Sequence, residues 1–134
     1  MIFAKSKFLV VFAVISMAML LGFNCTQPGA GGGGTTLTPL TFVSAVQTGG
    51  SDGSADSTEL TLTFSVDPTT LAASDITVTG ATKGALSGTG LTRTLAISDI
   101  VVANGANVTV AITSPSGFNL SGSPQTAVVQ HNQL

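Results

Sequence analysis

Few side chains of this 134-residue chain are suited to catalysis. The only histidine is His131, three residues from the C-terminus, and the only cysteine is Cys25. A hydrolase needs a nucleophile with a general base within reach, and a histidine at the end of a terminal strand is ordinarily solvated. Serine and threonine are numerous because they face solvent on strands and fill turns, so their abundance identifies no nucleophile. We therefore predict no catalytic residue and no cofactor, and expect that the chain is not an enzyme.

Carboxylates form a second group of candidates, because their oxygens bind calcium. Asp52, Asp56 and Glu59 lie close together in a segment rich in glycine and serine. Their spacing does not match the calcium loop of EF-hands, and calcium takes about six to eight oxygen ligands from a shaped site. A solvated turn is the favoured interpretation, and a weak metal site at these three residues is the alternative.

Cys25 ends a segment with the features of a bacterial export signal. Lys5 and Lys7 precede an apolar run at residues 8–23, and the cysteine follows almost at once. The run has sixteen residues, fewer than the roughly twenty that a helix needs to span a bilayer, and no basic cluster follows it. A cleavable signal peptide at residues 1–24 is therefore predicted, with the thiol as the landmark for processing.

The residues LLGFNC at positions 20–25 resemble the looser lipobox of spirochaete lipoproteins. Gly22 and Asn24 stand where the usual bacterial box has leucine and a small residue. The resemblance implies that Cys25 receives a diacylglycerol and becomes the acylated N-terminus after cleavage. Such chains anchor a protein stably, at about 0.8 kcal/mol per buried methylene. Two alternatives stay open: a free thiol after cleavage elsewhere, or an uncleaved anchor.

Removal of residues 1–24 leaves an acidic chain with few charges. Two basic residues remain against six acidic ones, which gives a formal charge of −4. Phosphate binding depends on clustered Lys and Arg, so nucleic acid is not expected as a partner, and an anionic membrane surface is disfavoured as well. With Cys25 used for the anchor no disulfide forms, and about 110 residues suffice for one domain with one core.

Residues 25–38 are predicted to be the lipidated cysteine and a flexible linker. Four consecutive glycines at 31–34 cost much backbone entropy to order and have no side chains to pack. A glycine-rich loop that binds phosphate needs a preceding strand, a following helix and usually a lysine, and none is present. We therefore expect a tether that leads into a domain at residues 39–134.

Apolar and polar residues alternate from residue 39 onward, which is the period of half-buried β-strands. The alternation is clearest at residues 58–66 and 107–113, whose predicted inward residues are Leu60, Leu62, Phe64, Val108, Val110 and Ile112. Further strands are predicted at residues 40–46, 75–79, 83–86, 91–97 and 126–130. The facing of the last strand stays open, and a short helical turn at residues 69–74 is expected to place Leu71 on the core.

One strand breaks the pattern. At residues 91–97, Arg93 falls on the same face as Leu91, Leu95 and Ile97. An isolated guanidinium is costly to bury, so we expect Arg93 near an edge or with its side chain extended outward.

The order of these strands resembles bacterial Ig-like repeats of surface and cell-envelope proteins. The segments that carry the resemblance are LTLTFS (60–65), LAASDITVTG (71–80), KGALSGTG (83–90) and SPSGFNLSGSP (114–124). It covers residues 40–131 and implies an all-β fold, an Ig-like antiparallel β-sandwich of about seven strands. Because the chain has no Tyr or Trp, only the general sandwich is implied, without the core tryptophan or tyrosine corner of antibody domains.

These expectations combine into a non-catalytic, lipid-anchored protein of the bacterial cell envelope, at the outer membrane or the cell surface. Its Ig-like module would serve adhesion, protein interaction or envelope structure, with a protein or glycan partner that the sequence does not identify. The alternative is a lipoprotein that binds a small molecule or a carbohydrate. The absence of Trp and Tyr counts against carbohydrate, since Phe42, Phe64 and Phe118 are the only aromatic residues of the domain.

Overall fold

The computed structural model describes residues 34–132 and shows an all-β fold. The chain from Thr36 onward forms one compact unit. The predicted signal peptide at 1–24, the lipid site Cys25 and most of the linker at 25–38 lie outside the described residues. Among residues 34–132, no helix has the length and apolar character needed to cross a bilayer.

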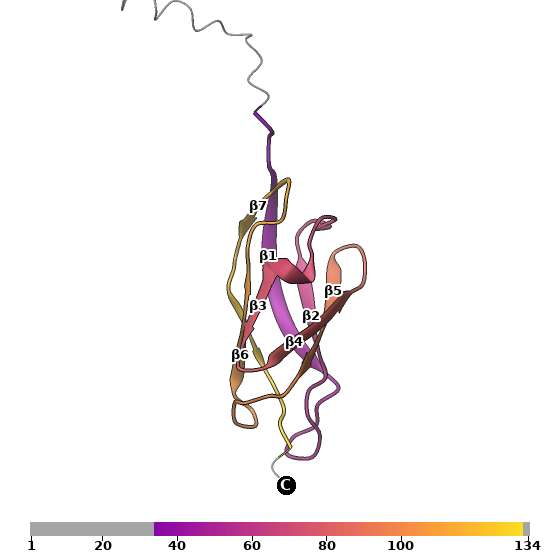
Figure 1. The fold of residues 1–134 in the computed structure, drawn as a ribbon, viewed down its shortest axis with the longest axis vertical. Helices are drawn as coiled ribbons and strands as arrows, with labels where there is room; N and C mark the ends of the chain where they lie inside the picture. The colour runs from indigo at the N-terminus through magenta and orange to yellow at the C-terminus, as the bar shows by residue number, and fades with distance from the viewer. Residues whose placement is uncertain (1–33, 133–134) are drawn as a thin grey trace, which may run out of the picture. The chain divides into compact units, whose positions relative to one another are not determined.

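Eight strands and one short 3-10 helix make up the described part of the chain (Figure 1). In chain order they are β1 (Thr38–Thr48), β2 (Glu59–Phe64), the 3-10 helix η1 (Ala73–Asp75), β3 (Ile76–Thr79), β4 (Thr82–Ser87), β5 (Thr92–Ser98), β6 (Asn107–Ile112), β7 (Phe118–Ser121) and β8 (Gln125–Val128). They form a five-stranded sheet of order β4-β5-β2-β1-β7 and a three-stranded sheet of order β3-β6-β8. The pairs are antiparallel, as predicted, except β1 with β7, which is parallel.

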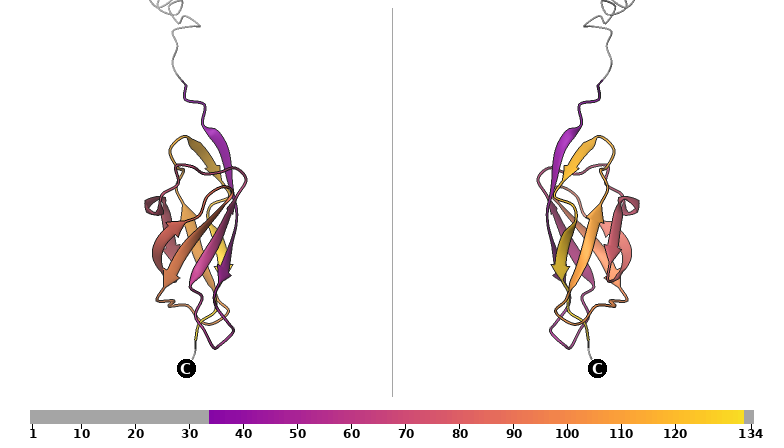
Figure 2. Two further views of the ribbon diagram at one scale, coloured as in Figure 1. Left: turned by 90° about the vertical axis from the view of Figure 1, so that its right-hand side faces the viewer. Right: turned by 90° about the vertical axis from the view of Figure 1, so that its left-hand side faces the viewer.

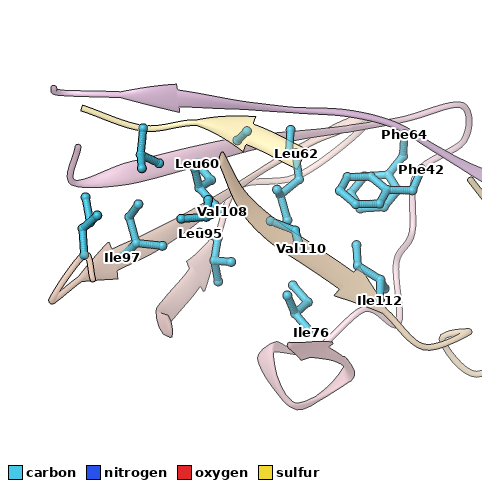
Figure 3. Close-up of a cluster of buried hydrophobic side chains, with 14 of the residues drawn as sticks. Phe42, Leu60, Leu62, Phe64, Ile76, Leu95, Ile97, Val108, Val110 and Ile112 are labelled. Carbon is cyan, nitrogen blue, oxygen red and sulfur yellow. The ribbon is translucent and has the colours of Figure 1, made fainter. Parts of the chain in front are cut away.

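The core lies between the inner faces of the two sheets. Side chains of β1, β2 and β5 from one sheet meet those of β3, β6 and β8 from the other (Figure 3). The predicted inward residues of β2 and β6 are all buried. Phe42 and Phe64 stack on each other with ring centroids 5.3 Å apart and an interplanar angle of 23°, an arrangement that contributes about 0.5–1.5 kcal/mol beyond burial. This apolar layer is the main source of stability in a chain without disulfides.

Strand β1 changes the face that it buries partway along its length. Its register with β2 shifts between Phe42 and Ser44, which is a β-bulge. The inward residues are Leu40 and Phe42 before the bulge and Ala45 after it. Strict alternation from Leu40 and Phe42 would also place Val46 on the inner face. Because of the bulge, Val46 faces outward and is 58% exposed.

The described chain has one strand more than the seven predicted, because residues 118–121 form β7 before the predicted last strand. The chain crosses from one sheet to the other between β7 and β8. β7 pairs with β1 in one sheet, and β8 pairs with β6 in the other. Gly122 permits the crossing, because its φ is +78° and a Cβ there would lie 2.5 Å from the Phe42 carbonyl oxygen. Gln125 Nε2 donates to the Phe42 and Gly122 carbonyls at 3.1 and 2.7 Å, which fixes the crossing segment. Beyond it, Ala127 and Val129 face the core.

Arg93 contradicts the expectation of an edge or outward position. It lies on β5, between β4 and β2, and only 7% of its surface is exposed. Its guanidinium forms an ion pair of 2.6 Å with Asp67 and donates to the Gly90, Thr92 and Pro68 carbonyls. The charge is tolerated in the interior because the loop after β2 supplies acceptors for it. Leu91, predicted to face the core, precedes β5 and is 54% exposed.

Lys83 joins the two sheets on the side where β3 and β4 are the edge strands. Its ammonium donates to the Ala73 and Ile76 carbonyls, both at 2.6 Å. The carbonyl of Asp75, the residue before Ile76, accepts from the Thr113 N–H next to β6. Because successive carbonyls of a strand point to opposite sides, the Ile76 carbonyl points to the free edge of β3. Lys83 thus occupies an edge acceptor that would otherwise be available to another strand.

The helical turn expected at residues 69–74 occurs later, at Ala73–Asp75. Asp75 sets this position, since its carboxylate accepts from the Ala72 N–H at 2.9 Å while its own N–H donates to the Ala72 carbonyl. Leu71 packs against the core, as predicted, and is half-buried.

Removal of the partner of Arg93 should destabilise the fold. We expect Asp67→Ala to lower the free energy of unfolding by about 1–3 kcal/mol, because a buried guanidinium loses its counter-ion but keeps three carbonyl acceptors. The carboxylate is 41% exposed, so the full cost of breaking a buried pair does not apply. Urea unfolding measures the change, with the exposed Glu59→Ala as the control. Equal stabilities for the two variants would show that the ion pair contributes nothing.

Candidate functional site

The structure gathers several candidate residues at the end of the sheets where the described chain terminates. Asp52 and Asp56 lie in the loop between β1 and β2, and His131 lies beyond β8. Glu59 begins β2, is exposed, and pairs across the sheet with Thr48 and Ala96, so it takes no part in the polar contacts of the two aspartates. Within residues 34–132, no three His, Cys, Asp or Glu side chains are grouped to hold a metal ion.

Ser57 is the buried centre of this end of the molecule. Only 1% of its surface is exposed. Its hydroxyl donates to Gln47 Oε1 at 2.8 Å and accepts from the Gln130 N–H at 2.8 Å, while its own N–H donates to the Gln130 carbonyl at 2.9 Å. Gln47 Oε1 also accepts from the Gly50 N–H at 3.2 Å. Ser57 therefore ties the end of β1, the loop after it and the segment after β8 together.

Asn104 holds the same segment from the loop between β5 and β6. Its Oδ1 accepts from the His131 N–H at 3.0 Å, and its Nδ2 donates to Asp52 Oδ1. The neighbouring Gly105 N–H donates to the Val129 carbonyl at 2.9 Å, and the Val129 N–H donates to the Ala106 carbonyl. The turn at Asn104 is thus fastened to the chain on both sides of Gln130.

Asp56 completes the attachment. Its Oδ1 accepts from the Asn132 N–H at 2.6 Å and lies 3.2 Å from His131 Nδ1. The angles of the second contact are not those of a hydrogen bond, so it is an ion pair only when the imidazole is protonated. Both side chains are partly exposed, which limits its contribution to stability. We call the residues that hold segment 129–132 the C-terminal clasp: Gln47, Asp52, Asp56, Ser57 and Asn104.

The clasp is a structural arrangement without a nucleophile and base in contact. The Ser57 hydroxyl is directed to the Gln47 amide and the Gln130 backbone. The His131 side chain contacts Asp56, and no hydrogen bond joins it to Ser57. Activation of a serine requires a base in hydrogen-bond reach, so this arrangement does not provide the chemistry of a hydrolase.

Two surfaces lie beside the clasp. A groove of about 380 Å³ between β1 and β8 is lined by Ala45, Val46, Gln47, Thr126, Val128 and Gln130, none charged or aromatic. The outer face of the five-stranded sheet carries hydroxyl side chains in register across β2 and β5, with Thr61 opposite Thr94 and Thr63 opposite Thr92. The groove has no charged lining residue. The hydroxyl-rich face carries one carboxylate, Glu59, which lies on β2 two residues before Thr61 and is exposed.

Part of the clasp could be predicted from the sequence. Asp52 and Asp56 stood out as carboxylates, and the Asn104-Gly105 pair has the composition of a turn. Ser57 carried no local signal, because it gains its role from Gln130, 73 positions away. Gln47 takes part only through its hydrogen bond with Ser57. Comparison of the chain with protein-family models, curated proteins and solved structures finds no match.

The Ser57 hydroxyl should be the most sensitive polar group of the clasp. Ser57→Ala leaves the Gln130 N–H and Gln47 Oε1 without that partner in a buried place, so we expect a loss of about 1–3 kcal/mol in the free energy of unfolding. Ser54→Ala, in the exposed part of the same loop, should change it by less than about 0.5 kcal/mol. Chemical denaturation measures both. A Ser57→Ala variant as stable as the wild type would mean that this network does not hold the tail.

Proposed function

We propose that this chain is a non-catalytic protein of the bacterial cell envelope, held on the outer membrane or cell surface by lipid on Cys25, which presents an Ig-like module for adhesion, protein interaction or envelope structure. The observation that carries the proposal is a basic and apolar leader that ends on the only cysteine of the chain. An uncharged glycine-rich stretch and a compact unit of two sheets follow it. This is the order of parts of a tethered surface module.

The strand order supports an Ig-like module. If β7 and β8 are counted as the halves of one interrupted strand, seven strands remain in chain order. The first, second, fourth and fifth then belong to one sheet, and the third, sixth and seventh to the other. Ig constant-type domains divide their strands in this way, as ABED and CFG. The parallel pairing of β1 with β7 arises because the first half of the last strand joins the sheet of the first strand.

The positions of the chain ends suit a tethered display. β1 begins at the end of the two sheets opposite to the loop between β1 and β2 and the segment after β8 (Figure 1, Figure 2). Attachment through the residues before Thr38 leaves the loops 49–58 and 99–106 and the hydroxyl-rich sheet face for contacts with a partner. A face of threonine hydroxyls with the carboxylate of Glu59 suits a protein or glycan surface better than a phosphate-rich ligand, which requires clustered positive charge.

The alternative function, a lipoprotein that binds a small molecule or carbohydrate, has less support. Carbohydrate sites commonly use exposed aromatic faces. Phe42 and Phe64 are buried and stacked on each other in the core (Figure 3), and Phe118 is half-buried against it. The groove between β1 and β8 would have to bind a ligand with aliphatic, amide and hydroxyl groups alone.

Lipidation is tested at the cysteine. We expect mass spectrometry of protein isolated from its native membrane to show an acylated N-terminal Cys25. We also expect Cys25→Ala to move the protein from the membrane fraction to the soluble fraction, because a hydrophobic anchor is lost. Ser54→Ala serves as the control for the substitution itself. An unmodified Cys25 in membrane-bound protein would refute the lipid anchor.

A further inference from the structure

The Asn104-Gly105 pair forms a tight turn that is fixed to the C-terminal segment. The Ala106 N–H donates to the Ala103 carbonyl at 3.0 Å, and Gly105 has a φ of +74°. A positive φ at the third position is the requirement of a type II turn, which glycine meets without strain. The turn lies in an exposed loop, with Ala103 and Gly105 open to solvent and Asn104 half-buried.

An asparagine followed by glycine can deamidate without an enzyme. The backbone nitrogen of the glycine attacks the side-chain Cγ, the new C–N bond closes a succinimide ring, and the amide nitrogen leaves as ammonia with the proton taken from the glycine nitrogen. Water then adds to the ring and opens it to aspartate or isoaspartate. Glycine favours the attack because it has no side chain to hinder the approach and its backbone is flexible.

In the described structure, all the groups that must react are engaged. The attacking nitrogen, Gly105 N, donates its hydrogen to the Val129 carbonyl at 2.9 Å. The Asn104 Oδ1 accepts from the His131 N–H, and the leaving nitrogen Nδ2 donates to Asp52. Because the partners of Gly105 and of Oδ1 both belong to segment 129–132, ring closure requires that this segment separate from the turn.

We propose that Asn104 is a site of spontaneous deamidation, that the C-terminal clasp controls its rate, and that the reaction irreversibly weakens the clasp. Val129 and His131 protect the residue while the clasp is closed. Each opening of segment 129–132 exposes the Asn104-Gly105 pair to ring closure. The inference is independent of the proposed function, since it rests only on contacts within residues 34–132.

The product opposes closure of the clasp for an electrostatic reason. Deamidation replaces the donor that faces Asp52 with a carboxylate oxygen, so a hydrogen bond becomes a contact between like charges. The other titratable groups here are Asp56 of the clasp and His131 of the segment that it holds, and these two contact each other. An isoaspartate would also insert a methylene into the backbone of the turn and displace its hydrogen bonds to Val129. The segment after β8 therefore loosens as the protein ages.

The rate of the reaction tests the control by the clasp. The full chain is incubated at mildly alkaline pH, and Asn104 is followed by peptide mapping and mass spectrometry, with a synthetic peptide of residues 99–110 as the unfolded reference. We expect the folded wild type to react at least tenfold more slowly than the peptide, since the open state is a minor population. Ser57→Ala should accelerate the reaction and Ser54→Ala should not. A folded protein that reacts as fast as the peptide, or equal rates in both serine variants, would overturn the proposal.

A second experiment uses the wild-type protein, so a folding defect of the Ser57→Ala variant cannot affect its result. The wild-type protein is incubated in urea concentrations below its unfolding transition, where local opening increases while the global fold persists. The rate at Asn104 should rise with urea in parallel with the exchange of the Val129 amide hydrogen. A rate that does not change with urea would contradict control by opening.

The effect of the product is tested with Asn104→Asp. Amide hydrogen exchange in segment 129–132 should become faster in this variant, on the order of tenfold, because a hydrogen bond to a charged group is lost and repulsion replaces it. Asn104→Asp combined with Asp52→Asn should recover part of the protection, since the amide restores a donor and removes the like charge. Unchanged exchange in the single variant, or no recovery in the double variant, would refute the electrostatic mechanism.

Discussion

The apolar layer between the two sheets is the interaction on which the rest of the structure depends. It contains the inner residues of six strands, and no disulfide is formed to support it, since the single cysteine precedes the domain. Few charges are available either, because charged residues are 7% of the chain against roughly a quarter in ordinary domains. Stability must therefore come from burial and from hydrogen bonds within the sheets. The layer also fixes the strand order, because each strand must present its apolar face to it.

Three polar groups join parts of the chain between the strands: Arg93 and Ser57, which are buried, and Lys83, which is half-buried. Arg93 holds the loop after β2, Lys83 connects η1 and the edge of β3 to β4, and Ser57 links the end of β1 to the segment after β8. Each of the three groups has its partners, as buried polar groups require. The clasp around Ser57 differs from the other two closures because it holds a segment outside the strands, after β8, which can separate without unfolding the core. This difference makes the deamidation at Asn104 dependent on local opening.

Local sequence patterns predicted the strands better than their arrangement. Alternation identified the inward residues of β2 and β6, since a period of two needs no knowledge of the partner strand. It was wrong at Leu91, and it gave no sign of the bulge after Phe42 or of the crossing from β7 to β8. Arg93 was misplaced because its counter-ion Asp67 and the Pro68 carbonyl lie 26 and 25 residues away in the sequence. The clasp was only partly visible for the same reason, as its hydrogen bonds join residues of distant loops.

Native-state hydrogen exchange across residues 34–132 tests the central claim most directly, that one apolar layer makes the two sheets a single cooperative unit. We expect the slowest amides to lie in β2, β5 and β6 and to share one opening free energy, equal to that of global unfolding. This includes β6, although it belongs to the other sheet. Faster exchange is expected at β4, β7 and segment 129–132. Distinct opening free energies for the slowest amides of the two sheets would contradict the account, because the sheets would then unfold separately.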